Sequence, residues 1–374
     1  MKEFSITNKE KLRRIDPVIL FCVLGMNIMS IITLAAASDA YGTWYPKTQT
    51  LASVIGFIGM ATLTFIDYEA LFSKLKYVFF ATSVILLVVV FFFGEGSMGN
   101  ANWLRIPGTN LSWQPSEFVK ITFMITFALH LNHVKKKINH PWSVIQLMLH
   151  AGLIVGLVML TGDLGMALVY MAIMIFMLFA SGVSLWYMFG GFITVLIASP
   201  ILWTFLTDKQ QRRILVGFNP DLDPLDIGMQ QIASRNAIIS GGFRGAGFSG
   251  GSKYPSIPAG WSDCLFAVHA EKFGFIGAFL YVVLITVLIF RILWLAGHSR
   301  KTYASYICVG IAGMFIAQAA ENIGMCLGML PVVGITLPFF SYGSSSIVSS
   351  YILIGLIQSI STHNKKYYFE RESG

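Results

Sequence analysis

Charged residues are scarce in this sequence. Asp, Glu, Lys and Arg make up only 12% of its 374 residues, whereas 55% are hydrophobic. Globular proteins carry about 25% charged residues, and the mean hydropathy of this chain is +0.69. The composition therefore excludes an ordinary water-soluble domain and predicts a polytopic membrane protein.

Cysteine is also scarce, and the few cysteines form no pattern. They are scattered in or beside apolar stretches, at Cys22, Cys264, Cys308 and Cys326. Such spacing offers neither a disulfide framework nor a CxxC metal motif. His130 and His133 share a helix face, but they adjoin the basic string KKKINH, where a solvated rim is the simpler interpretation. The sequence lacks internal repeats and low-complexity tracts as well.

Long apolar runs, by contrast, are abundant. A helix needs about 20 residues to cross the ~30 Å hydrocarbon core of a bilayer. About ten runs qualify, near residues 17–37, 48–66, 75–93, 117–132, 143–160, 164–181, 185–206, 265–290, 303–329 and 340–361. The first run is too long for the apolar core of a secretory signal, so we expect a retained helix. An even number of spans places both termini on one side.

The net charge of +8 fits this topology better than it fits nucleic acid, so we expect no nucleic-acid partner. Lys and Arg gather at the termini and in the short loops on one side, which the positive-inside rule makes cytoplasmic. Two loops, about 94–116 and 207–264, then face outward; the second, between spans seven and eight, is longer than a connection needs. We expect an all-α polytopic membrane protein with about ten transmembrane helices and cytoplasmic termini, forming one integral membrane domain over residues 1–374.

Ionisable residues at membrane depth are costly, which makes them candidate functional groups. Glu117 and Lys120 stand three residues apart and so share one helix face. A buried pair that neutralises itself and a role in binding substrate explain them equally well. Three more polar residues stand near the start of the same predicted span, Arg105, Gln114 and Ser116. Their presence keeps the substrate-binding interpretation open.

Two further acids stand where apolar helices begin, Asp163 in TGDLGMAL and Asp263 in GWSDCLFAV. The helix dipole favours an acid at such a place, so capping is the leading alternative for both. Asp263, however, follows a basic, glycine-rich loop and precedes Glu271 by about two turns. A carboxylate poised at the water–lipid boundary is suited to act as a general base on a sugar hydroxyl.

The glycine-rich run GGFRGAGFSGG contains a formal GxGxxG match without the strand–helix context of a dinucleotide site. Its glycines suit either a close approach of backbone amides to a phosphate or a loop that folds back on the membrane face. Nearby Arg212 and Arg244 supply counter-charge for a pyrophosphate, although a solvated loop is an equal alternative. The hydroxyl-rich segment LPVVGITLPFFSYGSSS is broken by Pro and Gly, so we expect it to be buried in protein or to line a wet cavity.

These strings together resemble the SEDS family of bacterial shape, elongation, division and sporulation proteins, which includes RodA, FtsW and SpoVE. The strings NWLRIPGTNLSWQPSEFVKI, GDLG, NPDLDPLDIGMQQIASRNAIISGGFRGAGF, SDCLFAVHAEKFGFIG and LPVVGITLPFFSYGSSS carry the resemblance, which covers nearly the whole chain. NIGM and PVVG, with a short C-terminal tail, are more similar to RodA than to FtsW.

The resemblance implies a peptidoglycan glycosyltransferase that polymerises lipid II on the outer face of the bacterial cytoplasmic membrane. It also implies a class B penicillin-binding protein as partner, together with other membrane proteins of elongation or division complexes. Asp263 matches the family's essential aspartate. The substrate-binding candidates are Trp103, Arg105, Gln114, Ser116, Glu117, Lys120, Asp163, Arg212, Arg244, Glu271 and Ser341. The metal ligands are unknown, and a divalent cation, Mg or Mn, is the one candidate cofactor.

The sequence departs from the family at two acidic positions, which Ala259 and Lys272 occupy. Two rival functions therefore stay open. One is a flippase or transporter of the lipid-linked precursor, for which a polar intramembrane cavity serves equally well. The other is a non-catalytic scaffold that activates a partner synthase.

Overall fold

The computed structural model describes residues 14–96, 102–105, 112–204 and 207–363. Most of the described residues are helical. Two strands of two residues each, β1 (Leu104–Arg105) and β2 (Ser112–Trp113), pair in antiparallel fashion. The α-helices are α2 (Pro17–Ala36), α3 (Ser38–Tyr41), α4 (Trp44–Phe65), α5 (Tyr68–Phe93), α6 (Pro115–Val134), α7 (Pro141–Leu160), α8 (Leu164–Ser181), α9 (Leu185–Thr204), α10 (Asp208–Phe218), α11 (Met229–Gly241), α12 (Leu265–Gly297), α13 (Thr302–Cys326) and α14 (Ser344–His363). Short 3₁₀ turns are η1 (Lys135–Lys137), η2 (Pro220–Leu222) and η3 (Tyr254–Ser256).

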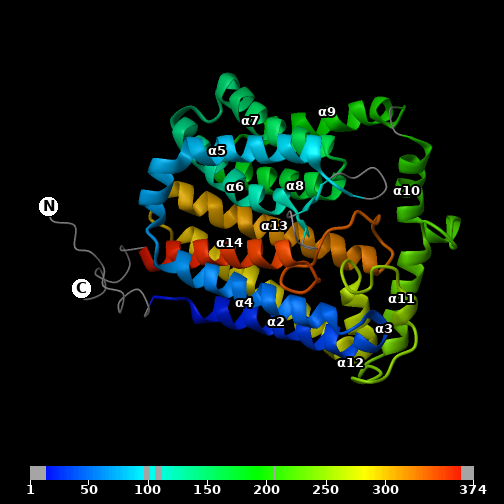
Figure 1. The fold of residues 1–374 in the computed structure, drawn as a ribbon. Coiled ribbons are helices and arrows are strands. Elements are labelled where there is room, and N and C mark those ends of the chain that lie inside the picture. Colours follow the sequence, from blue (N-terminus) through cyan, green and yellow to red (C-terminus); the bar gives the residue numbers. More distant parts are fainter. Residues whose placement is uncertain (1–13, 97–101, 106–111, 205–206, 364–374) are drawn as a thin grey trace.

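The long helices lie side by side, and α10 and α11 stand across one end of the bundle (Figure 1). Among the described residues, eight helices are long and apolar enough to cross a membrane. The other two predicted spans correspond to α6, which carries Glu117 and Lys120, and to α9, whose apolar part is the shorter stretch Leu185–Ile201. The predicted all-α polytopic membrane protein is confirmed, whereas the number of ten spans stays a prediction.

The two ends of the described chain meet at the end of the bundle opposite α10 and α11 (Figure 1). Asp16 caps α2 by accepting from the backbone N–H of Val18 at 3.0 Å. Its own N–H donates to Gln358 of α14 at 2.9 Å, and its Oδ2 pairs with Arg291 of α12 at 2.6 Å. The start of α2 and the end of α14 therefore lie together at one end of the bundle.

Helices α4 and α14 pack closely because small residues face bulky ones. A Cβ at Gly56 would lie 2.7 Å from the Tyr351 ring, and one at Gly355 would lie 2.8 Å from the Met60 carbonyl oxygen. Membrane helices associate through such small residues, since lipid offers no hydrophobic drive for helix pairing. Helix α4 also contacts the loop that precedes α14, where the Gln49 side-chain amide donates to the Ser341 carbonyl at 3.1 Å.

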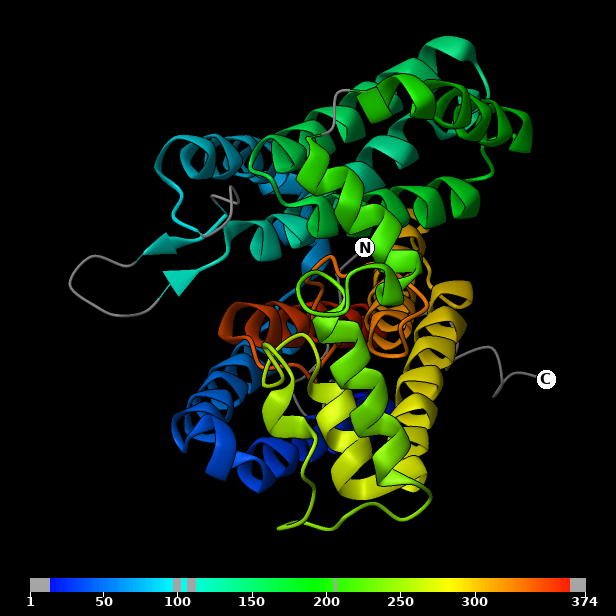
Figure 2. The ribbon, with the colours of Figure 1, turned by 90° about the vertical axis from the view of Figure 1, so that its right-hand side faces the viewer.

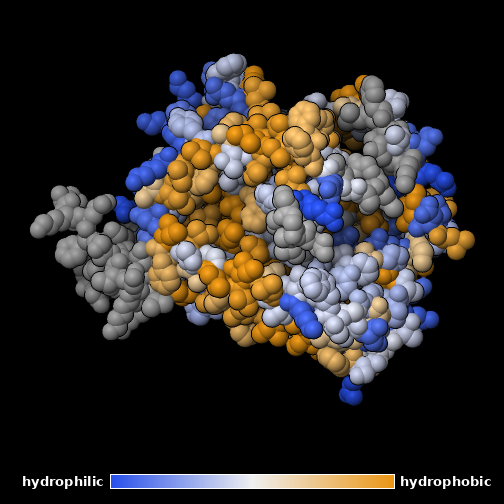
Figure 3. All heavy atoms as spheres, in the orientation of Figure 1, coloured by the Kyte–Doolittle hydropathy of each residue, from blue (hydrophilic) through white to orange (hydrophobic). Residues whose placement is uncertain are grey.

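Large apolar side chains cover much of the outer face of the helical bundle (Figure 3). Phe92 and Phe93 of α5 are 71% and 74% exposed, and Trp186 of α9 is 85% exposed. A soluble monomer rarely shows apolar patches of that size. Lipid tails are a suitable environment for such a surface, so it supports placement in a membrane.

Residues 207–264, predicted to form the long outer loop, are a folded structure rather than a linker. They contain α10 and α11, and α11 lies across the end of the bundle (Figure 2). Backbone N–H groups of Ala246 and Gly247 donate to the carbonyls of Glu271 and Lys272 at 2.9 Å each. Those carbonyls lie just before Gly274, whose φ of 67° breaks α12.

Several predicted spans differ from the observed helices at one end. Helices α4 and α5 begin at Trp44 and Tyr68, ahead of the predicted residues 48 and 75. The sequence placed one span at 265–290, but α12 runs to Gly297 and is interrupted at Gly274 because the outer loop pairs with its backbone there. The last span was expected from residue 340, but α14 begins at Ser344 because residues 331–343 run irregularly.

Candidate active site

A cavity of about 640 Å³ lies between the start of α4, the β hairpin and the loops before α12 and α14. Its walls combine aromatic rings, amides, hydroxyls and two carboxylates. The lining residues are Trp44, Thr48, Gly96, Asn102, Trp103, Ser112, Gln114, Asp163, Trp261, Ser262, Asp263, Val333, Gly334, Thr336, Tyr342, Gly343, Ser344 and Ser346. None of these described residues is a lysine, arginine or histidine, so the charged groups in the wall are both acids.

Asp263 is held in the wall through its backbone. Its carbonyl accepts from the Asn322 side-chain amide at 2.7 Å, and the same amide group donates to the carbonyl of Ile335 at 2.7 Å. Asn322 is fully buried in α13 and so ties the loop before α12 to the loop before α14. Gly334 of that second loop has a φ of +73° and lies beside an Asp263 carboxylate oxygen. The backbone is thereby fixed while the carboxylate faces the cavity.

The pKa of the Asp263 carboxyl group is set mainly by burial. Burial raises the pKa of Asp263 to about 6, and a hydrogen bond from Ser262 opposes that rise. Within the described residues, no side-chain nitrogen donates to this carboxylate. A carboxyl group with few donors and a pKa near neutrality suits a general base.

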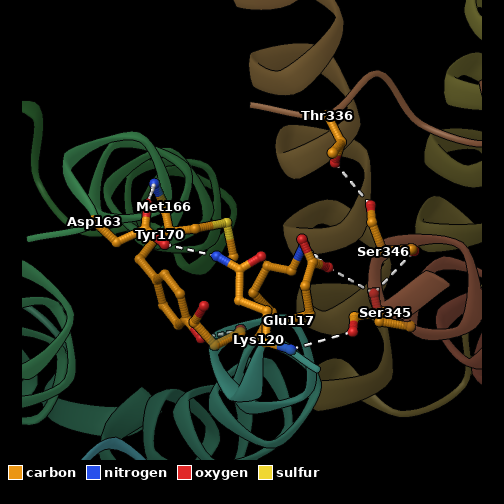
Figure 4. A network of polar contacts seen from close by, with 11 residues as sticks. Glu117, Lys120, Asp163, Met166, Tyr170, Thr336, Ser345 and Ser346 are labelled. Atoms are coloured by element: carbon orange, nitrogen blue, oxygen red, sulfur yellow. Dashed lines mark hydrogen bonds and ion pairs between the residues drawn. The ribbon is translucent and has the colours of Figure 1, made fainter. Parts of the chain in front are cut away.

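Both carboxylate oxygens of Asp163, the second acid in the wall, accept hydrogen bonds (Figure 4). Asn102 and Gln114 donate to its Oδ2 at 2.8 and 2.7 Å, and the backbone N–H of Met166 donates to its Oδ1 at 3.0 Å. Burial raises the pKa of Asp163, while those three donors oppose the rise. The predicted helix cap is therefore present, and the same carboxylate anchors two cavity-lining amides.

Glu117 and Lys120 form an ion pair with 2.7 Å between Oε2 and Nζ, on one face of α6 as their spacing predicted. They are 2% and 0% exposed, and Ser349 of α14 donates to the same Glu117 oxygen at 2.7 Å. Figure 4 shows the pair inside the contact between α6 and α14. Neither side chain lines the cavity, so the arrangement supports the self-neutralising alternative, and a substrate role stays a prediction.

Glu271 lies in the first part of α12 and holds the outer loop. Its carboxylate accepts from the backbone N–H groups of Ser252, Lys253 and Tyr254 at 2.9, 2.8 and 2.5 Å. These amides directly follow the glycine-rich run, so an acid of the chain itself occupies this set of anion-binding donors. Gly245, with a φ of +81°, allows the run to approach the α12 backbone. The loop folds back, as one of the two interpretations of these glycines expected.

The remaining predicted site residues lie outside the cavity wall. Arg105 on β1 and Arg244 after α11 are exposed, and Arg212 of α10 is 66% exposed and pairs with Asp223 at 3.5 Å. Ser116 is buried, and its carbonyl accepts from Tyr170 at 2.7 Å. Ser341 is buried too, where its hydroxyl accepts from the Leu337 N–H at 2.9 Å.

The structure brings together four of the predicted residues in one cavity: Trp103, Gln114, Asp163 and Asp263. The sequence reasoning missed Trp44, Trp261 and Tyr342, which supply aromatic surface to the same cavity. Trp261 and Tyr342 stood inside quoted strings, two residues before Asp263 and one after Ser341, and that closeness was the available signal. Thr336 and Ser346 come from the hydroxyl-rich segment, which was expected to be buried in protein or to line a wet cavity; these two residues line the cavity.

Metal ligands do not gather here. Across the described part of the chain, no group of three or more His, Cys, Asp or Glu residues could hold an ion. Asp163 already has three hydrogen-bond donors, which leaves Asp263 as the only lining carboxylate without a side-chain nitrogen donor among these residues. The described lining residues do not form a closed, all-protein site for Mg or Mn; Mg²⁺ is usually held by one or two carboxylates together with substrate phosphates.

Comparisons with known proteins agree over almost the full length. The family of cell cycle proteins that groups FtsW, RodA and SpoVE matches residues 14–366. The chain is 31% identical to a probable peptidoglycan glycosyltransferase FtsW of Trichlorobacter lovleyi, with 94% of each chain covered. It is 32% identical to the peptidoglycan glycosyltransferase MrdB of Escherichia coli K12, again with 94% of each covered.

Solved structures show the same fold. A chain from a structure on the coordination of polymerization and crosslinking by a peptidoglycan synthase complex has a TM-score of 0.83 at 27% identity, covering 94% of this chain and 99% of that one. The rod shape determining protein RodA of Thermus thermophilus has a TM-score of 0.72 at 24% identity, covering 94% and 98%.

Proposed function

Because the chain belongs to the SEDS family of cell cycle proteins, we propose that it is a peptidoglycan glycosyltransferase that polymerises lipid II. Its relatives FtsW and MrdB bear the name of that activity. The observation that carries the proposal is the Asp263 carboxylate, which faces a cavity of about 640 Å³ and has a pKa near 6.

In the reaction, Asp263 takes the proton from the 4-hydroxyl of the acceptor sugar. The hydroxyl oxygen forms the new glycosidic bond to the anomeric carbon of the donor, while the bond from that carbon to the pyrophosphate oxygen breaks. Undecaprenyl pyrophosphate leaves with the electron pair. General-base assistance of this kind contributes about 10²–10⁴ in rate.

The membrane brings the donor and acceptor substrates together. Both substrates carry lipid tails, so the bilayer holds them at one depth and lowers the entropic cost of bringing them together. Arg105, Arg212 and Arg244 lie on the loop side and stay our candidates for stabilising the pyrophosphate charge. No step of this mechanism requires a cation held by the protein, and the need for Mg or Mn stays a prediction that chelation would test.

The proposed setting is the outer face of a bacterial cytoplasmic membrane. One structural neighbour comes from a complex that coordinates polymerization and crosslinking. A class B penicillin-binding protein is therefore the proposed partner, alongside other proteins of elongation or division complexes. The relatives named FtsW and MrdB are nearly equal in identity, 31% and 32%. The greater similarity to RodA thus stays a prediction.

The test is a polymerisation assay with purified protein and labelled lipid II, with and without the penicillin-binding protein. We expect glycan polymer from the wild type and none from Asp263→Ala. Undiminished polymer from Asp263→Ala would remove the assigned base. Lipid II flipping without polymer would favour the transporter, and stimulation of the partner without intrinsic activity would favour the scaffold.

A further inference from the structure

Two of the four cysteines meet beside Asp263, although they are far apart in the sequence. Cys264 follows Asp263 and is the N-cap residue of α12, and Cys326 is the last residue of α13. The Cys326 sulfur lies 3.9 Å from the Asp263 carbonyl oxygen and accepts from the Ala267 N–H. It is within hydrogen-bond reach of the Cys264 sulfur as well. The fold thus places two thiols together at the start of α12, directly after the proposed base.

The surroundings of Cys264 favour its thiolate form. Hydrogen bonding from the Cys326 thiol lowers the pKa of Cys264, while burial and the neighbouring Asp263 carboxylate oppose that fall. The Gln230 side-chain amide of α11 donates to the Cys264 sulfur at 3.2 Å. A position at the start of a helix also lowers the pKa of a thiol. Because the thiolate is the reactive form of cysteine, Cys264 is the attacking thiol of the pair and Cys326 is the resolving thiol.

Burial decides which oxidant can reach the pair. Cys264 is 1% exposed and Cys326 is 0% exposed, so a bulky thiol reagent has no access to either sulfur. Asp263 lines the cavity, however, and Cys264 is the next residue along the chain. A molecule little larger than water, such as hydrogen peroxide, therefore has only a short distance to cross. The contact with α11 places the pair at the predicted outer end of the bundle, where disulfides persist better than in the cytosol.

We propose that Cys264 and Cys326 form a peroxide-sensitive pair, whose oxidation to a disulfide slows the chemistry at Asp263. The inference rests on the proposed function, because its effect is a lower rate of lipid II polymerisation. Cys308, the other cysteine of α13, takes no part. At a rise of 1.5 Å per residue it lies about 27 Å from Cys326 along the helix.

The oxidation takes two steps. The Cys264 thiolate attacks one oxygen of hydrogen peroxide, the O–O bond breaks, and the hydroxide that leaves takes up the thiol proton to become water. Cys264 is then a sulfenic acid. The Cys326 sulfur attacks the Cys264 sulfur, the S–O bond breaks, and the oxygen leaves with the Cys326 proton as a second water. The two thiols lose two electrons in total, and the peroxide is reduced to two waters.

The disulfide changes the segment that carries Asp263. It draws the two sulfurs closer together than hydrogen-bonded thiols lie, so it pulls the residue after Asp263 toward α13. It also replaces the thiol beside the Asp263 carbonyl, which Asn322 holds at 2.7 Å. A shift of about 1 Å in a catalytic group can cost about 10² in rate. The reduced pair therefore corresponds to the active enzyme and the disulfide to the slowed one.

The test uses the full-length purified protein, treated with hydrogen peroxide and then with dithiothreitol. After each step, free thiols are blocked under denaturing conditions and mass spectrometry identifies the peptide pairs. We expect a disulfide between Cys264 and Cys326 after peroxide. The kcat for lipid II polymerisation should fall by about 10- to 100-fold, with a smaller change in KM, and dithiothreitol should restore it.

The control variants separate the pair from other oxidation. Cys264→Ser and Cys326→Ser should polymerise lipid II near the wild-type rate and keep that rate in peroxide; serine is also a favourable N-cap residue at position 264. Cys308→Ser is the matched control, because it removes a buried cysteine of α13 but keeps the pair, and it should respond as the wild type does. The chain has 17 methionines, whose oxidation all the variants share.

A peroxide-treated wild type without the Cys264–Cys326 disulfide would overturn the inference. So would a disulfide that leaves kcat unchanged, or inhibition that persists in Cys264→Ser. Mass spectrometry reads the disulfide without lipid II, so the pair and the proposed function can fail separately. A wild type that forms the disulfide but polymerises no lipid II when reduced would contradict the function.

Discussion

Asp163 and Asp263 line the same cavity, and burial raises the pKa of each carboxyl, yet their surroundings differ. Asp163 accepts from two side-chain amides and one backbone N–H. Asp263 is fixed through its carbonyl by Asn322, and its carboxylate has no side-chain nitrogen donor among the described residues. An acid whose two oxygens accept three hydrogen bonds organises the wall, whereas one whose carboxylate accepts only from the Ser262 side chain can exchange a proton with a ligand.

The substitution with the largest expected effect on the contrast between the two acids is Asp263→Asn, which keeps the size of the side chain and removes the base. We expect the rate of lipid II polymerisation to fall by about 10²–10⁴, the range that general-base assistance contributes. The thermal unfolding midpoint in detergent should stay near that of the wild type, because the Asn322 contact involves only the backbone of residue 263. An equal fall in Asp163→Asn would contradict the division of roles.

A third buried acid, Glu117, extends the comparison to the interior of the bundle. Lys120→Met leaves its charge unpaired, and breaking a buried pair costs about 3–5 kcal/mol. Thermal unfolding of Lys120→Met should therefore occur well below that of the wild type, and adding Glu117→Gln should restore most of the loss. Lys301→Met, which breaks the exposed pair with Glu69 at 3.2 Å, is the matched control and costs about 0–1 kcal/mol. If the two single variants unfold alike, the α6 pair does not stabilise the fold.

Asp163→Ala tests the organising role directly. This substitution leaves the side-chain amides of Asn102 and Gln114 without their acceptor, and a buried donor left without a partner costs about 1–3 kcal/mol. We expect a lower unfolding midpoint and a modest loss of activity from the loosened wall. Asp67→Ala removes an exposed helix cap of α5, which accepts from Glu69 N–H at 2.9 Å, and should cost about 1 kcal/mol. If the unfolding midpoint of Asp163→Ala falls less than that of Asp67→Ala, the contacts of Asp163 with the Asn102 and Gln114 amides do not stabilise the fold.

The helical architecture was predictable because about 20 apolar residues suffice to mark a span. The Glu117–Lys120 pairing was predictable too, since residues three apart share a helix face. The division between the two aspartates was not. Both stand just before helices, but only Asp163 caps one, by accepting from the Met166 N–H; the N-cap of α12 is Cys264, so the capping alternative is wrong for Asp263. Tertiary contacts with Asn102, Gln114 and Asn322 separate the two acids further.

The outer loop shows a second limit of sequence reasoning. The glycine-rich run and Glu271 were each noted as ligand-binding candidates, but they bind one another, because α12 breaks at Gly274 and exposes its carbonyls to the loop. Periodicity cannot reveal such a pairing between segments. The edge-on contact between the Tyr41 and Trp261 rings joins residues more than 200 positions apart and was hidden for the same reason.

The most direct test of the account is the pH dependence of kcat/KM for lipid II polymerisation. A base must be deprotonated, so with the pKa of Asp263 at about 6 the rate should fall about tenfold per pH unit below that value. Asp163→Asn should keep the same acid limb, since its carboxylate takes no proton from substrate. A profile that stays flat to about pH 4.5, near the ordinary pKa range of carboxyl groups, would contradict the assignment of Asp263 as the base.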